Sequence, residues 1–191
     1  LIVHDSISEE MMTLLEEKIT AMLDVNRRET FSGCLVDINA KNKHEDLLKK
    51  ARTSGSIVLE FDYEKSSEGC YVNPAIVLRN PKNSEDTVEE VFSPILFAEN
   101  FETNQQALAK ANSTPYGLTA AIWTSDFYEA SFFSNNIKSG VVNVNGPTHG
   151  AEFQFPFGGQ GYSGNGTKEV GVNCLSEYSF ERLISVTNYV D

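Results

Sequence analysis

Residues 118–144 have the sequence LTAAIWTSDFYEASFFSNNIKSGVVNV, in which two β-prone runs flank a helical stretch. Leu118–Thr124 and Val141–Val144 are typical of strands. Asp126, followed three residues later by Glu129, predicts the start of the intervening helix. Apolar residues recur on one side of that helix, at Phe127, Ala130, Phe133 and Ile137. A strand, a covering helix and a second strand in close succession indicate an α/β fold.

The same alternation continues toward the N-terminus. After an initial strand, the capping-box pattern of Ser6 and Glu9 predicts a helix through about Leu23. Further expected elements are a short helix over His44–Arg52, strands over Ile57–Phe61 and Ile95–Ala98, and a helix that begins at a capping box of Thr103 and Gln106. Cys70–Leu78 is β-rich, but Pro74 predicts a sheet edge or an irregular segment there. We therefore predict a three-layer α/β/α fold with a mostly parallel sheet.

The end of the chain predicts a short helix over Lys168–Tyr178 and then a terminal strand. Leu183–Val190 is β-prone, with Ile184, Val186 and Val190 on one side. A lone strand needs a partner, which is either an edge of the internal sheet or another segment or subunit.

Composition excludes several classes of protein. The 191 residues include 15 Lys and Arg against 27 Asp and Glu, and the net charge of -12 repels nucleic acid and anionic lipid. No apolar run approaches the roughly 18 to 20 residues of a membrane helix, and the opening residues 1–3 do not show the basic n-region of a signal peptide. The 3 scattered cysteines, Cys34, Cys70 and Cys174, are typical of a reducing compartment, so we expect a cytoplasmic protein.

Gly159–Gly164 matches the GxGxxG pattern of dinucleotide-binding turns, but its context disfavours that interpretation. Pro156 interrupts the strand that such a turn requires. Thr167-Lys168 has the reverse of the order that a phosphate-binding loop needs, and no histidine or aspartate is tied to Ser163 by spacing. His149 and Glu152 lack a third ligand for a metal. A structural glycine turn is the favoured interpretation.

Five motifs in one order carry a family resemblance. They are VEEVFSP at 88–94, ANSTPYGL at 111–118, IKSGVVNVN at 137–145, PFGG at 156–159 and SGNGTKE at 163–169. The set resembles the aldehyde dehydrogenase superfamily over nearly the whole chain. It is similar to the part that follows the catalytic cysteine in that family, with residues 1–178 in the catalytic domain and residues 179–191 as a terminal strand of the oligomerisation domain.

The resemblance implies site residues. Glu90 is expected to hold the nicotinamide-side ribose of NAD or NADP, because a carboxylate can accept from both vicinal hydroxyls. Phe92 is expected beside the same ribose, and Phe157 at the aldehyde pocket. Ser93 stands where the family usually has glycine. The alternatives are a solvated acid at Glu90 and ordinary core aromatics at Phe92 and Phe157.

The resemblance also implies what lies elsewhere. The thiolate nucleophile, the oxyanion-hole amide and the glutamate base are expected upstream of Leu1, since none of the three cysteines has the family's GQ-x-C context. No catalytic and no metal-binding residue is therefore expected in this chain, and the isolated chain should be inactive.

Three hypotheses for function follow. In the first, the parent protein oxidises an aldehyde to an acid through a cysteine thioester, and the loop Asn145–Glu152 resembles that of branches that handle semialdehydes, although it offers no basic residue to a carboxylate. We expect a homo-oligomer formed through the terminal strand. In the second, the chain is a non-catalytic scaffold of the same fold, and in the third it is a free-standing nucleotide-binding module built on Gly159–Gly164.

Overall fold

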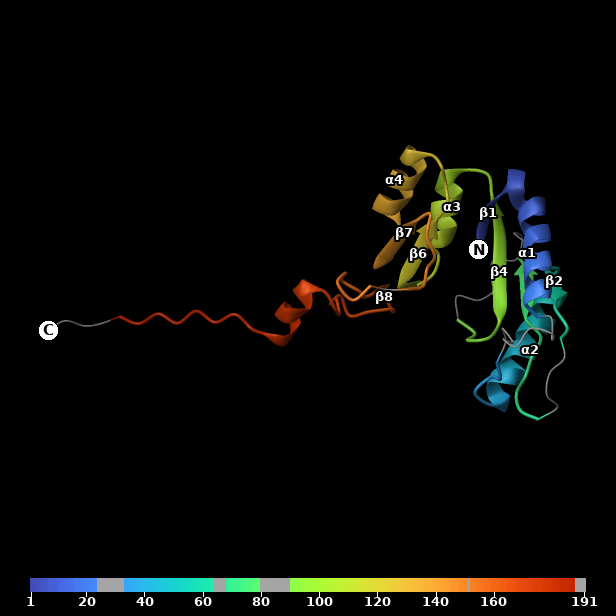
Figure 1. The fold of residues 1–191 in the computed structure, drawn as a ribbon, viewed down its shortest axis with the longest axis horizontal. Helices are drawn as coiled ribbons and strands as arrows, with labels where there is room; N and C mark the ends of the chain where they lie inside the picture. Colours follow the sequence, from blue (N-terminus) through green and yellow to red (C-terminus); the bar gives the residue numbers. More distant parts are fainter. Residues whose placement is uncertain (24–32, 64–67, 80–89, 151, 188–191) are drawn as a thin grey trace. The chain divides into compact units, whose positions relative to one another are not determined.

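The computed structural model describes residues 1–23, 33–63, 68–79, 90–150 and 152–187. The chain divides into two compact units, Leu1–Ala111 and Asn112–Asp191. Figure 1 shows the elements of each unit in colours that follow the sequence.

The first unit contains a four-stranded sheet with the order β1-β4-β3-β2. Its strands are β1 (Ile2–His4), β2 (Ile57–Glu60), β3 (Ala75–Leu78) and β4 (Ile95–Phe101). β4 is parallel to both of its neighbours, β1 and β3, whereas β2 is antiparallel to β3. The predicted α/β fold with a mostly parallel sheet is therefore confirmed.

Helices lie on both sides of this sheet. In Figure 1, α1 (Ser8–Met22) and α3 (Asn104–Ala111) flank β4 on opposite sides. The helix α2 (Ile38–Thr53) supplies Leu47, Leu48 and Ala51 to the buried core. These side chains pack with β3 residues Ala75 and Val77, and their burial is the main force that holds helix and sheet together.

In the first unit, helix starts follow local capping chemistry, with one prediction confirmed and two corrected. The Thr103 hydroxyl accepts from the Gln106 backbone N–H at 3.3 Å, and the Gln106 side chain accepts from the Thr103 N–H at 3.3 Å, as a capping box requires. Ser6 does not cap α1: a 3-10 turn, η1 (Asp5–Ile7), comes first, and Ser6 bonds to His4. The helix α2 begins before His44, because the Asp37 carboxylate accepts from the Ala40 N–H at 2.8 Å.

The prediction for Cys70–Leu78 was partly wrong. β3 lies inside the sheet, between β2 and β4, and its Ile76 is 0% exposed. Pro74 immediately precedes the strand, where its missing N–H costs no ladder bond. Its carbonyl accepts from the Phe61 N–H at 2.9 Å, so the proline leads the chain into an inner strand.

The second unit contains the β-α-β element predicted from residues 118–144. It consists of β6 (Thr119–Ile122), α4 (Phe127–Asn136) and β7 (Val141–Val144), and the two strands are parallel. The Asp126 side chain caps α4 by accepting from two backbone N–H groups. A small antiparallel pair, β5 (Tyr116–Gly117) with β8 (Gln160–Gly161), completes the unit.

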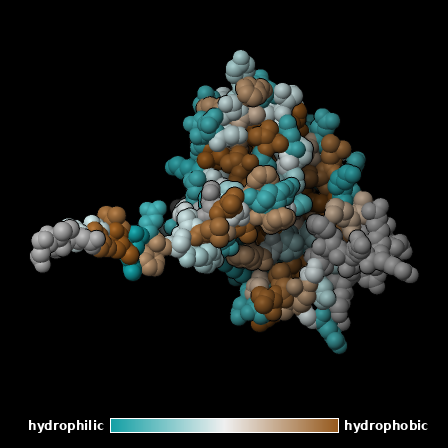
Figure 2. Space-filling model, turned by 60° about the vertical axis from the view of Figure 1, so that its left-hand side comes forward, coloured by the Kyte–Doolittle hydropathy of each residue, from teal (hydrophilic) through white to brown (hydrophobic). Residues whose placement is uncertain are grey.

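The end of the chain departs from the prediction. The helical segment is a short 3-10 helix, η2 (Val172–Tyr178). Residues 183–187 of the predicted terminal strand are irregular, and residues 188–190 lie outside the described part of the chain. Leu183 is 94% exposed, with Ile184 and Val186 also exposed. Figure 2 shows hydrophobic atoms beside the grey C-terminal residues, as expected for a strand that lacks its partner.

Candidate functional site

Glu90 and Phe92 lie in the irregular segment that leads into β4. Glu90 is exposed and Phe92 is 82% exposed, whereas Val91 between them is buried. Val91 packs into the core cluster that includes Leu47 and Val77. With Val91 anchored in the core, the side chains on either side of it, Glu90 and Phe92, face solvent. Glu89, which precedes Glu90 in the VEEVFSP motif, lies outside the described residues.

Phe92 has a strained backbone. Its φ of 51° lies in the left-handed region, which a bulky residue adopts rarely and at a cost of about 1 to 3 kcal/mol. Hydrogen bonds on the next residues fix the turn, because the Ile95 N–H donates to Ser93 O at 2.7 Å and the Ala75 N–H donates to Pro94 O at 2.9 Å. Burial of the ring does not compensate for this strain, because the Phe92 side chain is 82% exposed.

Ser93 does not need the conformational freedom of the glycine that the family usually has there. Its φ is not positive; the left-handed residue is Phe92 instead. The Ser93 hydroxyl oxygen is buried and has no hydrogen-bond partner among the described residues. The serine is therefore compatible with the backbone of this segment.

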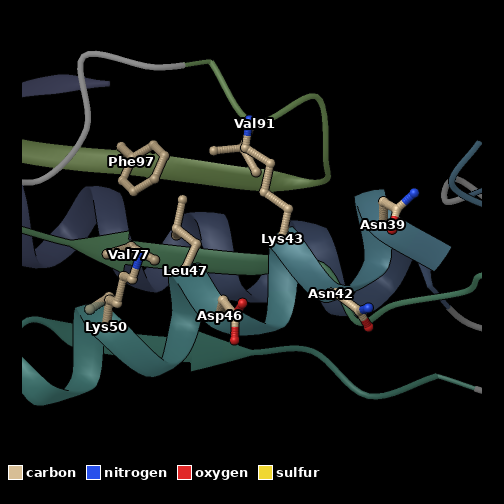
Figure 3. Close-up of a pocket in the computed structure, with 10 residues that line it drawn as sticks. Asn39, Asn42, Lys43, Asp46, Leu47, Lys50, Val77, Val91 and Phe97 are labelled. Atoms are coloured by element: carbon tan, nitrogen blue, oxygen red, sulfur yellow. The ribbon is translucent and has the colours of Figure 1, made fainter. Parts of the chain in front are cut away.

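Behind Val91 lies a cavity of about 340 Å³. Figure 3 shows Val91 and Phe97 on one side of it and α2 on the other, with Leu47 pointing between them. Polar side chains of α2, among them Lys43 and Asp46, line its rim. The sequence did not predict this cavity, because it depends on how α2 packs across β3 and β4.

Phe157 lies in the second unit and is half-buried. Its backbone forms an antiparallel bridge with Glu169: the Phe157 N–H donates to Glu169 O at 2.9 Å, and the Glu169 N–H donates to Phe157 O at 2.8 Å. The PFGG and SGNGTKE motifs are thus joined directly. The Lys168 ammonium also donates to the Gly158 carbonyl.

A pocket of about 360 Å³ opens beside Phe157. Phe155, Pro156 and Val141 give it apolar walls. Thr148, His149 and Glu152, from the loop after β7, add polar groups. No arginine or lysine is among the described residues that line it. Sequence reasoning had singled out His149 and Glu152 only as poor metal ligands, and the described residues contain no group of three or more side chains arranged for a metal.

The glycine block is a structural turn, as the sequence indicated. Gly161 has a φ of +57°, and a Cβ there would collide with the Pro115 carbonyl. That carbonyl instead accepts from the Tyr162 N–H at 3.0 Å, while the Gly117 N–H donates to the Ser163 hydroxyl at 3.1 Å. The block packs on β5, and no helix follows it at once as a dinucleotide-binding turn would require.

Among the described residues, no helix is both long and apolar enough to cross a membrane.

Comparison with known proteins gives one consistent family. The sequence model of the aldehyde dehydrogenase family matches residues 1–184. The chain is similar to the NADP/NAD-dependent aldehyde dehydrogenase PuuC of Escherichia coli K12, with 29% identity over 189 residues, which cover 98% of this chain and 37% of that protein. It is 30% identical to aldehyde dehydrogenase family 7 member A1 of Brassica napus over 178 residues, 92% of this chain and 35% of that protein.

Solved structures agree with the sequence relatives. Betaine aldehyde dehydrogenase of Staphylococcus aureus, in complex with NAD+, superimposes with a TM-score of 0.79 at 27% identity, covering 93% of this chain and 36% of that one. The chain spans about 37% of the length of the curated relative PuuC. The predicted resemblance is confirmed: this chain belongs to the aldehyde dehydrogenase family.

Proposed function

We propose that this chain is the C-terminal part of an NAD(P)-dependent aldehyde dehydrogenase, with residues 1–178 in the catalytic domain and residues 179–191 in the oligomerisation domain. The observation that carries the proposal is the pair Glu90 and Phe92, both exposed on one short segment that Val91 anchors. The family match and the order of the motifs support it.

Glu90 is proposed to bind the ribose next to the nicotinamide. Its carboxylate has no hydrogen-bond or ion-pair partner within the part of the chain that the structure describes, so both oxygens can accept from vicinal hydroxyls. Phe92 offers an exposed ring two residues away, which can pack against the same ribose. When bound, NAD or NADP supplies the hydride acceptor for oxidation of the aldehyde. Glu90 and Phe92 orient that group, and neither takes part in proton transfer.

The pocket beside Phe157 is proposed as a wall of the aldehyde site. Its aromatic and aliphatic lining, from Phe155, Pro156 and Val141, suits the apolar part of an aldehyde. An acid semialdehyde would bring a carboxylate, and the described lining offers it neither arginine nor lysine while Glu152 would repel it. We therefore propose an uncharged or cationic aldehyde as substrate in preference to a semialdehyde.

The reacting groups are proposed to lie outside this chain. A thiolate nucleophile, an amide for the oxyanion and a general base are required for oxidation through a thioester. The three cysteines of the chain lie in contexts that do not match that nucleophile. The isolated chain should consequently show no aldehyde oxidation above background.

Substitution of Glu90 tests the cofactor site. In the complete natural protein that contains this sequence, Glu90→Gln should raise KM for NAD or NADP about tenfold, since a loss of 1 to 2 kcal/mol is typical of a hydrogen bond to a charged group. KM for the aldehyde should change little. Glu102→Gln is the matched control, because Glu102 is also exposed and lies just after β4.

Phe157→Ala should show the reverse pattern, with a raised KM for the aldehyde and little change for the cofactor. Equal effects of Glu90→Gln and Glu102→Gln on the cofactor would refute the assignment of Glu90. Unchanged aldehyde kinetics in Phe157→Ala would refute the assignment of the pocket.

A specific observation also favours a role of the C-terminal segment in assembly. Phe180, Leu183, Ile184 and Val186 are exposed on an irregular segment, which leaves β-prone apolar side chains without a strand partner in the described part of one chain. We propose that this segment forms a strand with another subunit in a homo-oligomer. Truncation after Tyr178 should lower the mass measured by light scattering. An unchanged mass after truncation would refute a role of this segment in assembly. If the protein assembles but does not bind NAD or NADP, the scaffold hypothesis is favoured.

A further inference from the structure

Two cysteines far apart in sequence meet at the surface of the first unit. Cys34 lies in the segment that leads to α2, and Cys70 lies in the segment that leads to β3. The Leu35 N–H donates to the Cys70 carbonyl at 2.9 Å, which joins the two segments. The Cys70 N–H in turn donates to the Cys34 sulfur at 2.9 Å. Both thiols are free in this structure.

Gly69 makes this close approach possible. Its φ of +97° is a backbone conformation that residues other than glycine rarely adopt, and a Cβ at this position would lie 3.2 Å from the Cys34 sulfur. The residue before Cys70 therefore leaves room for the Cys34 thiol against the backbone.

We propose that Cys34 and Cys70 form a reversible intramolecular disulfide, a redox modification site separate from the proposed cofactor and aldehyde sites. The backbone nitrogen of Cys70 lies 2.9 Å from the Cys34 sulfur. Because the sulfur of any cysteine lies only about 3 to 4 Å from its own backbone nitrogen, the Cys34 and Cys70 sulfurs lie within about 7 Å of each other. Rotation about χ1, with a small backbone adjustment, can bring them to bonding distance. A disulfide requires Cα atoms within about 7 Å, which the direct contact of the two residues permits.

The oxidant is a peroxide, and the order of steps follows exposure. Cys34 is exposed and Cys70 is half-buried, so the Cys34 thiolate meets hydrogen peroxide first. An S–O bond forms, the O–O bond breaks, and the departing hydroxide takes up a proton to become water. The Cys70 thiolate then attacks the sulfenic sulfur, the S–S bond forms, and the second oxygen leaves as water. Two thiols lose two electrons in total, and one peroxide is reduced to two waters.

The bond would add a covalent link where the segment before α2 meets the segment before β3, which only hydrogen bonds and packing now connect. Cys34 precedes Asp37, the cap of α2, and Cys70 precedes Val72 and β3. α2 and β3 share the core cluster of the unit. Oxidation should therefore stabilise this unit by restricting its unfolded chain.

Peptide mapping tests the proposal directly. The complete natural protein is treated with hydrogen peroxide, its remaining thiols are alkylated, and it is digested with trypsin without reduction. Cleavage at lysine and arginine releases residues 29–41 and 66–79, each with a single cysteine. We expect these two peptides to appear as one linked species that dithiothreitol separates. The oxidised protein should also unfold a few degrees higher than the reduced protein.

Serine variants supply the controls. Cys34→Ser and Cys70→Ser should each abolish the linked species and the thermal shift, while Cys174→Ser should leave both unchanged. Reduced Cys34→Ser should unfold at the temperature of the reduced wild type, because Cys34 is exposed. Recovery of residues 29–41 and 66–79 as separate alkylated or overoxidised peptides would overturn the proposal. A link from either peptide to Cys174, or to a second molecule, would overturn it as well.

Discussion

The strained backbone of Phe92 gives a prediction in which a substitution raises stability and weakens the site. At an ordinary exposed position glycine is less stable than alanine by about 0.5 to 1 kcal/mol, because it loses more backbone freedom on folding. At a φ of 51° this order should reverse, since alanine keeps the left-handed strain and glycine does not. The strain is worth about 1 to 3 kcal/mol and the greater backbone freedom of glycine offsets part of it, so Phe92→Gly should be more stable than Phe92→Ala by about 1 kcal/mol.

Loss of the ring affects both variants equally. The side chain is 82% exposed, so less than a fifth of its area of about 200 Å² is buried, and its removal costs at most about 1 kcal/mol. Comparison of glycine with alanine cancels this cost. Both variants should also raise KM for NAD or NADP, because both remove the ring that is proposed to pack on the ribose.

Urea denaturation of the complete natural protein measures the difference, with cofactor kinetics recorded on the same samples. Leu14, within α1 and 49% exposed, provides a control in the same unit. There glycine should be less stable than alanine by about 1 kcal/mol. If glycine at position 92 proves less stable than alanine, as at position 14, the left-handed conformation of Phe92 is wrong.

Three further predictions concern the first unit. His44 is 2% exposed, and burial lowers its pKa below the ordinary value. The unfolded state therefore takes up the proton first, and the free energy of unfolding falls as the pH drops below about 6.5, by at most about 1.4 kcal/mol per pH unit. Urea titrations at several pH values should show a flatter pH dependence for His44→Gln. Burial raises the pKa of Glu99, but hydrogen bonds from Lys110 at 2.9 Å and Arg79 at 2.7 Å outweigh it and hold that pKa below its usual value. The stability that these ion pairs contribute is present above about pH 4.5 and is lost as the pH falls further. Glu99→Gln should therefore lower the free energy of unfolding by about 1 to 2 kcal/mol near pH 7 and by less near pH 3. An equal loss at both pH values would contradict the ion pairs. Leu48 is 3% exposed in the core, so Leu48→Ala should lower the free energy of unfolding by about 2 to 5 kcal/mol at any pH. A decrease below about 1 kcal/mol, measured by denaturation, would refute that packing.

The sequence predicted the type and order of most elements because those depend on local chemistry. The Thr103 and Gln106 capping box was read correctly, since each side chain serves the other's backbone within four residues. The similar pattern of Ser6 and Glu9 gave a wrong N-cap for α1, because Ser6 lies within a 3-10 turn that precedes the helix. Pro74 led to the prediction of a sheet edge or an irregular segment, because the sequence does not reveal that an inner strand begins one residue later.

Site features were predictable only where a motif carried them. The motif singled out Glu90 and Phe92, and both are exposed, but the buried anchor between them, Val91, was not predicted. The left-handed backbone of Phe92 could not be read from its residue type, which disfavours that conformation. The contact of Cys34 with Cys70 was equally hidden, because it arises from two irregular segments that pair over a separation of 36 residues.

The alternation around Val91 makes the length of this segment more critical than its composition. Insertion or deletion of one residue between Val91 and β4 would shift the pattern by one position and exchange the inward and outward side chains. A frame-preserving loss of a single codon there would turn a charged or aromatic group into the core and expose an aliphatic one. Point substitutions at positions 90 and 92 leave the buried anchor Val91 in place, so the fold of this segment should tolerate changes at these two positions better than a change in its length.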